Sequence, residues 1–182
     1  MTAGEYTKRI LQELEETLSA LPEEALGGLT EKLLGAGRIY VAGAGRSGYA
    51  MRSFAMRLVH LGLTAYVVGD TVTPAIREGD LLLIGSGSGS TSGLLSMAQK
   101  ARKIGADLAL VTTRADSPIG ALASLTLRLP APTKETGIAS LQPMGSLFEQ
   151  ALLLTLDTAV LLLMERTGQT AQEMAARHAN LE

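Results

Sequence analysis

Four apolar residues at positions 81–84 lead directly into a turn of glycine, serine and threonine, in the sequence L-L-L-I-G-S-G-S-G-S-T. The apolar run is typical of a fully buried strand, and the apolar residues after the turn recur at helical spacing as far as Ile104. The turn therefore joins a buried strand to a helix, as in parallel sheets covered by helices. A flexible glycine–serine linker is the alternative, but linkers seldom separate two such apolar elements.

The same turn is suited to holding an anion. Backbone amides at a helix N-terminus carry partial positive charge, and Gly87 with its neighbouring glycines lets a phosphate approach the backbone closely. Ser86, Ser88, Ser90 and Thr91 add hydroxyl donors. The turn therefore predicts a phosphate site that uses neutral donors.

Short apolar runs alternate with helical patterns along the middle of the chain. The expected strands are 39–42, 65–68, 81–84, 108–112 and 125–129, and the expected helices are 6–21, 22–34, 48–61, 92–104, a short one near 117–123, 146–166 and one from 171. This pattern predicts an α/β fold, a three-layer α/β/α sandwich with a five-stranded parallel sheet in flavodoxin-like order. At 182 residues we expect one domain, with N-terminal helices over 1–37, the core over 38–130, and a loop, a long helix and a tail over 131–182.

The composition argues against several classes of partner. The chain has no cysteine and only two histidines, so we expect no metal site. Lys plus Arg number 16 against 18 Asp plus Glu, without a basic run, so nucleic acid is not expected. The apolar segment 148–164 is interrupted by Glu149 and Asp157 and is shorter than the roughly 20 residues of a membrane span. We interpret this segment as a buried or interface helix. The N-terminus has no apolar signal segment, so we expect a cytoplasmic protein.

A second glycine-rich turn, G-A-G-R-S-G at 43–48, follows the first strand and contains Gly45, Arg46 and Ser47. It matches the dinucleotide fingerprint, and Asp70 lies near the position of the ribose-binding acid, so an NAD-binding protein is an alternative. NAD binding at this turn would leave the serine-rich turn without a function. A typical dehydrogenase also needs a substrate domain, and the chain has no residues left to form one. Because both turns follow parallel strands, they meet at one edge of the sheet, where they can hold one phosphate.

Seven segments together resemble the sugar isomerase (SIS) domain family and, within it, the 6-phospho-3-hexuloisomerases. They are V-A-G-A-G-R-S-G, F-A-M-R-L-V-H-L-G, V-V-G-D-T-V-T-P-A-I, G-S-G-S-G-S-T, L-P-A-P-T-K, Q-P-M-G-S-L-F-E-Q and R-H-A-N-L-E. The resemblance implies isomerisation of D-arabino-hex-3-ulose 6-phosphate to fructose 6-phosphate through an enediol, without a cofactor. This is a step of formaldehyde fixation in the ribulose monophosphate route.

The resemblance also implies site residues and an assembly. It implies a phosphate site at Ser47, Ser86, Ser88 and Thr91, a catalytic base at Glu149, and a His178 that reaches the site of a neighbouring subunit in a tetramer built of dimers. Many SIS proteins have glutamate where this chain has Ser90, so any role of that acid is absent or moved here.

The residues alone leave several roles open. Glu149 precedes an apolar run, so it is either a base in an apolar site or an acid favoured by the helix dipole. Arg46 and Lys134 either neutralise phosphate, polarise a carbonyl or are solvated. His178 lies in a polar tail, and His60 is expected about 18 Å from the phosphate turn, at the end of its helix.

Two other functions remain as alternatives. One is an isomerase for another sugar phosphate, such as arabinose 5-phosphate or sedoheptulose 7-phosphate. The other is a non-catalytic sugar-phosphate sensor, although the first 37 residues are too few and too acidic for a DNA-binding domain.

Overall fold

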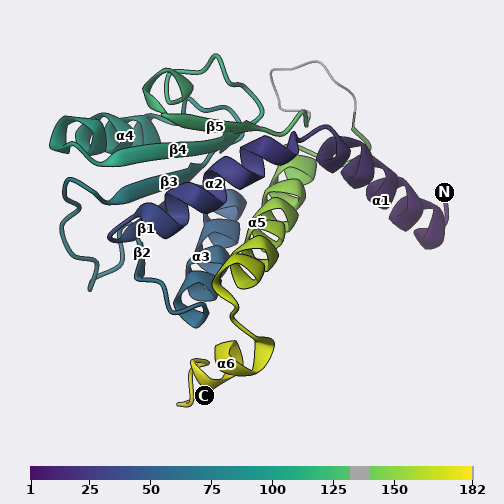
Figure 1. Ribbon diagram of the computed structural model, residues 1–182. Helices are drawn as coiled ribbons and strands as arrows, with labels where there is room; N and C mark the ends of the chain where they lie inside the picture. The colour runs from purple at the N-terminus through teal and green to yellow at the C-terminus, as the bar shows by residue number, and fades with distance from the viewer. Residues whose placement is uncertain (132–139, 182) are drawn as a thin grey trace.

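The computed structural model describes residues 1–131 and 140–181 and contains a five-stranded sheet in which every strand pair is parallel. The strands are β1 (Ile39–Gly43), β2 (Ala65–Val67), β3 (Leu81–Gly85), β4 (Asp107–Thr112) and β5 (Leu125–Arg128). Their order in the sheet is β2-β1-β3-β4-β5 (Figure 1). The predicted parallel sheet and its flavodoxin-like order are confirmed.

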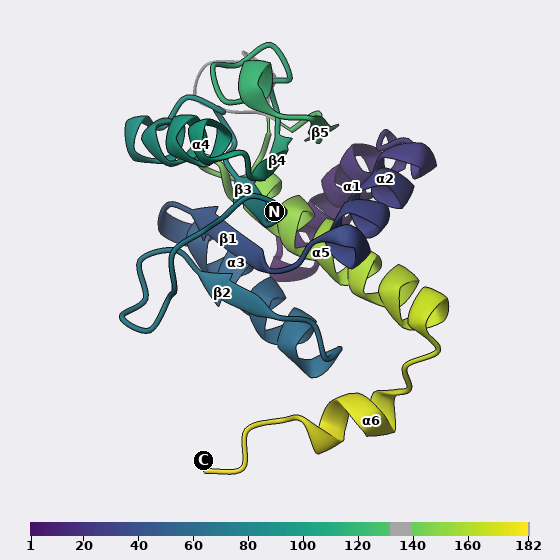
Figure 2. The same ribbon diagram turned by 60° about the vertical axis from the view of Figure 1, so that its left-hand side comes forward.

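Helices cover both faces of the sheet, as the views in Figures 1 and 2 show. The helices are α1 (Ala3–Ser19), α2 (Glu23–Gly35), α3 (Gly45–His60), α4 (Ser92–Ile104), α5 (Ser146–Thr167) and α6 (Ala171–Ala176), with a 3-10 turn at Gly120–Leu122. The strands alternate between two cores. Val41 and Leu83 face α3 and α5, whereas Tyr40 and Leu82 face α4. The expected three-layer sandwich is therefore confirmed.

The α5 helix lies inside the larger of these two cores. It has 22 residues, one more than the helix expected at 146–166. The full helix, unlike its apolar segment 148–164, is long and apolar enough to cross a membrane by length and composition alone. Half of its apolar window is buried, however, and it packs against α1, α2 and α3. These contacts are those of a core helix, as we expected. Leu153, Leu154 and Leu161 form an exposed apolar face along it.

The α3 helix begins at Gly45, three residues earlier than the sequence pattern suggested, because the N–H of Gly48 already donates to the carbonyl of Ala44 (3.3 Å). Its first turn packs closely on the end of β1. A methyl group on Gly48 would lie 2.8 Å from the carbonyl oxygen of Gly43. The glycine spacing of the first turn therefore serves helix–strand packing, which also occurs in the dinucleotide fingerprint.

Candidate active site

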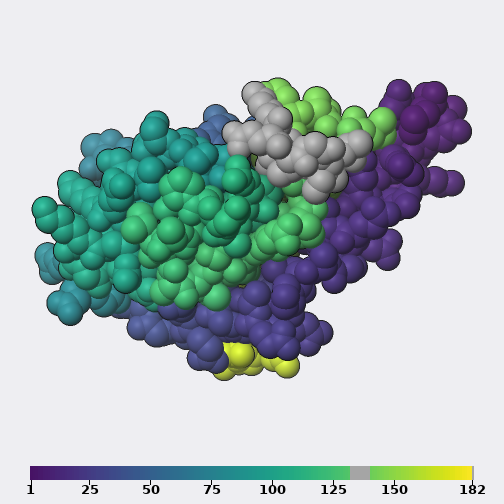
Figure 3. Space-filling model, turned by 90° about the horizontal axis from the view of Figure 1, so that it is seen from above, coloured from purple at the N-terminus to yellow at the C-terminus, as the bar shows by residue number. Residues whose placement is uncertain are grey.

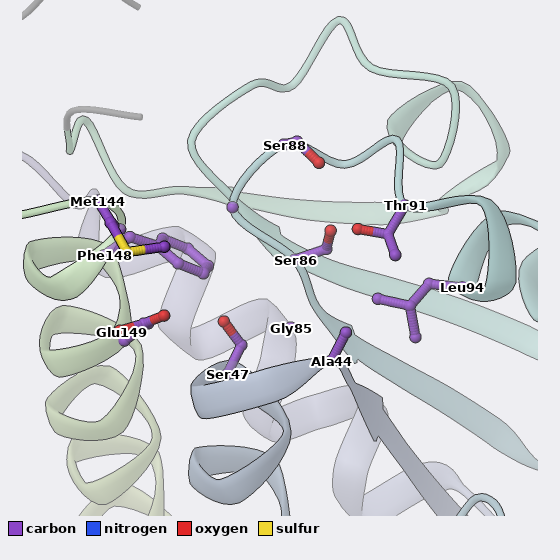
Figure 4. Close-up of a pocket in the computed structure, with 12 residues that line it drawn as sticks. Ala44, Ser47, Gly85, Ser86, Ser88, Thr91, Leu94, Met144, Phe148 and Glu149 are labelled. Atoms are coloured by element: carbon purple, nitrogen blue, oxygen red, sulfur yellow. The ribbon is translucent and has the colours of Figure 1, made fainter. Parts of the chain in front are cut away.

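A cavity of about 410 Å³ opens at the carboxyl edge of the sheet, beyond β1 and β3 (Figure 4). Its lining residues come from the two glycine-rich turns, from the first turn of α4, and from the start of α5 and the residues just before it. They are Ala44, Ser47, Gly85, Ser86, Gly87, Ser88, Thr91, Leu94, Met144, Gly145, Phe148 and Glu149. The two turns meet here as the sequence predicted, and Glu149, which the family resemblance implied, lines the same cavity as Ser47, Ser86, Gly87, Ser88 and Thr91.

The N-termini of three helices border this cavity. Ser47 lies in the first turn of α3, Thr91 is the N-cap residue of α4, and Gly145 is the N-cap residue of α5. None of these three ends has a side-chain cap, so backbone N–H groups remain available there. Three converging partial positive charges favour an anionic ligand without a lysine in the lining.

The serine-rich turn is fixed by hydrogen bonds to the neighbouring strand end. The carbonyl of Gly87 accepts hydrogen bonds from the Thr112 hydroxyl (3.0 Å) and from the hydroxyl and backbone N–H of Thr113 (2.8 and 3.1 Å). Ser86 Oγ accepts from the N–H of Gly89 (3.2 Å), and Ser88 Oγ accepts from the N–H of Ser90 (3.3 Å). Neither hydroxyl donates to a residue that the structure describes, so both protons are available to a phosphate.

Glu149 lies in the first turn of α5 and faces the cavity from the side opposite the serine-rich turn (Figure 4). Its side chain is 20% exposed. The guanidinium of Arg46 lies 3.1 Å from Glu149 Oε2, and the same nitrogen donates to the Ser146 hydroxyl (3.0 Å). The cavity thus places a carboxylate, a candidate general base, across from the hydroxyl and amide donors.

Glu13 of α1 anchors the segment that leads into α5, a role that sequence reasoning missed. Its carboxylate accepts hydrogen bonds from the hydroxyl of Ser140 (2.7 Å), the N–H of Leu141 (2.9 Å) and the amide of Gln142 (3.4 Å). Burial by itself would raise the pKa of the Glu13 carboxyl, but these hydrogen bonds lower the pKa below its usual value. No local sequence signal links Glu13 to residues more than 120 positions away.

Apolar residues of the lining were also missed as individual site residues, and two of them, Met144 and Phe148, lie in the segment Q-P-M-G-S-L-F-E-Q. Phe148 is buried and lies so close to the serine-rich turn that a methyl group on Gly87 would be 3.2 Å from its ring. Met144 is exposed and has a φ of 58°, a conformation that costs energy for a residue with a side chain. Strain beside a cavity is common at functional sites.

Other candidate residues lie outside the lining. Gly45 and Arg46 lie at the start of α3 but do not line the cavity, and Ser90 is exposed beside the turn, also outside the lining. Lys134 lies outside the described residues. Asp70, the acid of the NAD alternative, forms an ion pair with Arg52 (2.7 Å).

His178 lies far from the cavity of its own chain. Its ring packs against that of His60, with the ring centroids 5.2 Å apart, and Arg177 donates to the His60 carbonyl (2.9 Å). His60 is the last residue of α3, as expected, and so lies about 20 Å along the helix from Ser47. Figure 1 shows α6 and the C-terminus at the end of α5 away from its first turn. The pairing of the two histidines was not foreseen.

Comparison with known proteins identifies the family of this chain. The SIS domain family matches residues 32–156. A protein of Bacillus subtilis (strain 168) named 3-hexulose-6-phosphate isomerase is 44% identical over 100% of both chains. A protein of the same name from Mycobacterium gastri is 48% identical over 75% of this chain and 70% of its own.

A solved structure extends the similarity to the fold. The crystal structure of a Methanococcus jannaschii protein, for which a 3-hexulose-6-phosphate isomerase function was inferred, is 34% identical with a TM-score of 0.82. The match covers 97% of this chain and 96% of that chain. The chain therefore belongs to the SIS domain family, and its similarity to 3-hexulose-6-phosphate isomerases extends over its full length.

Proposed function

We propose that this protein catalyses the reversible isomerisation of D-arabino-hex-3-ulose 6-phosphate to fructose 6-phosphate. The observation that carries the proposal is that one cavity joins hydroxyl-lined turns to a carboxylate. The turns supply donors for the phosphate, and Glu149 supplies a base for the carbon skeleton. The names of the similar proteins select this sugar phosphate among those that such a cavity could accept.

The chemistry is a proton transfer between neighbouring carbons. Glu149 removes the proton from C2 of the 3-ketose, the electron pair of that C–H bond forms the C2–C3 double bond of a 2,3-enediol, and the C3 carbonyl oxygen takes up a proton to become a hydroxyl. This uptake is balanced by the proton that O2 gives up in the second half of the reaction. Return of the proton to C3, with loss of the hydroxyl proton at O2, gives the 2-ketose. No hydride leaves the substrate, so a nicotinamide is not required by this route.

A coupled assay tests this proposal directly. Purified protein is given 3-hexulose 6-phosphate, and the formation of fructose 6-phosphate is measured. Glu149→Gln keeps the side-chain shape but removes the base, so turnover should fall about 10²- to 10⁴-fold. Glu24→Gln, the same change at an exposed acid in the first turn of α2, is the matched control and should retain full turnover. A fully active Glu149→Gln protein would exclude Glu149 as the base.

We further propose that the active sites are shared within a homotetramer built of two dimers, with His178 completing the site of a neighbouring subunit. Two observations support this. His178 is held at the far end of α3, away from the cavity of its own chain. The first half of α1 projects beyond the rest of the protein (Figure 3) and exposes Tyr6 and Leu11, and α5 exposes Leu161. These are surfaces that association would bury.

Mixed oligomers test the sharing of sites. Glu149→Gln and His178→Ala proteins should each be impaired, yet a mixed oligomer contains sites with a native glutamate from one chain and a native histidine from the other. Random equal mixing should restore about a quarter of the wild-type sites, since two independent chains must each be intact. If co-refolding yields mixed oligomers with no more activity than the separate variants, His178 does not act in a neighbour's site.

The reaction also suggests a metabolic setting. We propose that the protein works in the cytoplasm, in the ribulose monophosphate route of formaldehyde fixation. The names of the similar proteins support the route, because they specify the same hexulose phosphate.

A further inference from the structure

Arg46 occupies a position that helix energetics disfavours. It is the second residue of α3, and the first turn of that helix contains no acidic side chain. A positive charge at a helix N-terminus is opposed by the helix dipole. The cost is offset by contacts with α5, since one guanidinium nitrogen reaches both Glu149 Oε2 (3.1 Å) and Ser146 Oγ (3.0 Å). The Arg46 side chain therefore stabilises the contact between α3 and α5 and does not stabilise α3 itself.

These contacts act on one oxygen of the candidate base. Arg46 does not line the cavity, and its side chain is 62% exposed, so it reaches Glu149 from outside the cavity. Glu149 Oε1 lies on the side of Gly145, which does line the cavity, and accepts no hydrogen bond from the residues that the structure describes. Oε2 is thus held by the guanidinium, while Oε1 remains available for proton transfer.

We propose that Arg46 is a positioning residue, which fixes the Glu149 carboxylate so that Oε1 faces the sugar. This inference rests on the proposed function, because it assigns Arg46 to the base of that reaction. It differs from a phosphate-binding role for Arg46. A phosphate ligand contributes mainly to substrate affinity, whereas a residue that positions the base contributes mainly to turnover.

Kinetics of three arginine variants separate the two roles. R46M should lower kcat about 10- to 100-fold, a part of what a general base supplies, and change KM less than about threefold. R46K should recover part of kcat, because a single nitrogen makes both contacts in the wild type. R52M is the matched control, since Arg52 lies on the same helix in an ion pair with Asp70 outside the cavity. It should have wild-type kinetics.

A double variant tests whether Arg46 acts through Glu149. If it does, R46M combined with E149Q should turn over no more slowly than E149Q alone. Losses that multiply would overturn the proposal. So would an R46M protein with unchanged kcat and a KM raised tenfold or more, which would assign Arg46 to the phosphate.

A crystal structure of R46M provides a readout that needs no activity. The Glu149 carboxylate should rotate or occupy several orientations in R46M, and an unchanged orientation would overturn the positioning role. If the wild-type protein does not isomerise the sugar phosphate, the proposed function fails, and this structure still decides whether Arg46 positions Glu149.

Discussion

Replacing Ser88 with alanine tests the phosphate-binding turn. Ser88 lines the cavity, and its hydroxyl accepts one hydrogen bond from the N–H of Ser90 but donates none to the residues that the structure describes. Its proton is therefore available to a phosphate oxygen. A hydrogen bond to a charged group contributes about 1.5–3 kcal/mol, which corresponds to a roughly 10- to 150-fold change in affinity.

The variant should therefore raise KM for the sugar phosphate about 10- to 150-fold and change kcat little, because the phosphate lies away from the reacting carbons. Folding should be nearly unaffected. Ser88 is only partly buried, and the N–H of Ser90 is exposed to water, so the lost bond costs at most about 1 kcal/mol of stability.

The assay measures KM and kcat by coupled turnover, together with the affinity for fructose 6-phosphate by calorimetry. Ser90→Ala is the matched control, since Ser90 belongs to the same turn but lies outside the cavity lining. It should bind as the wild type does. A well-folded Ser88→Ala protein with wild-type KM and affinity would refute the assignment of the serine-rich turn to the phosphate.

Three further predictions concern packing and pH. Gly48→Ala should lose about 1–3 kcal/mol in urea unfolding, because its methyl group would meet the backbone of Gly43, whereas Gly93→Ala meets no atom within 4 Å and should lose nothing. The stability gap between wild type and Glu13→Gln should be largest at neutral pH. It should shrink below pH 4.5, because the native hydrogen bonds lower the pKa of Glu13 and the unfolded chain protonates first. Burial, and then His178 and Arg57, lower the pKa of His60. As the pH decreases from 6.5, the unfolded chain therefore binds a proton at this histidine before the folded protein does, and the free energy of unfolding of the wild type should decrease. It should decrease more steeply than that of His60→Phe, which has no group to protonate at this position.

The sequence by itself determined the sheet and the location of the site. Buried parallel strands are short apolar runs, and all five appear in the structure within about two residues of their expected bounds. The turns after β1 and β3 had to meet because parallel strands place their carboxyl ends at one edge. Local composition then identified the hydroxyl donors, and the family resemblance identified Glu149 and His178 as candidates.

Only the tertiary structure decided which distant side chains meet. Arg46 and Glu149, Glu13 and the residues 140–142, and His60 and His178 are each separated by about 100 residues or more. Periodicity and capping patterns act over one or two helical turns, so they cannot specify such pairs. The packing of α1, α3 and α5 around one core sets these contacts, and through them the side-chain environment of the candidate base.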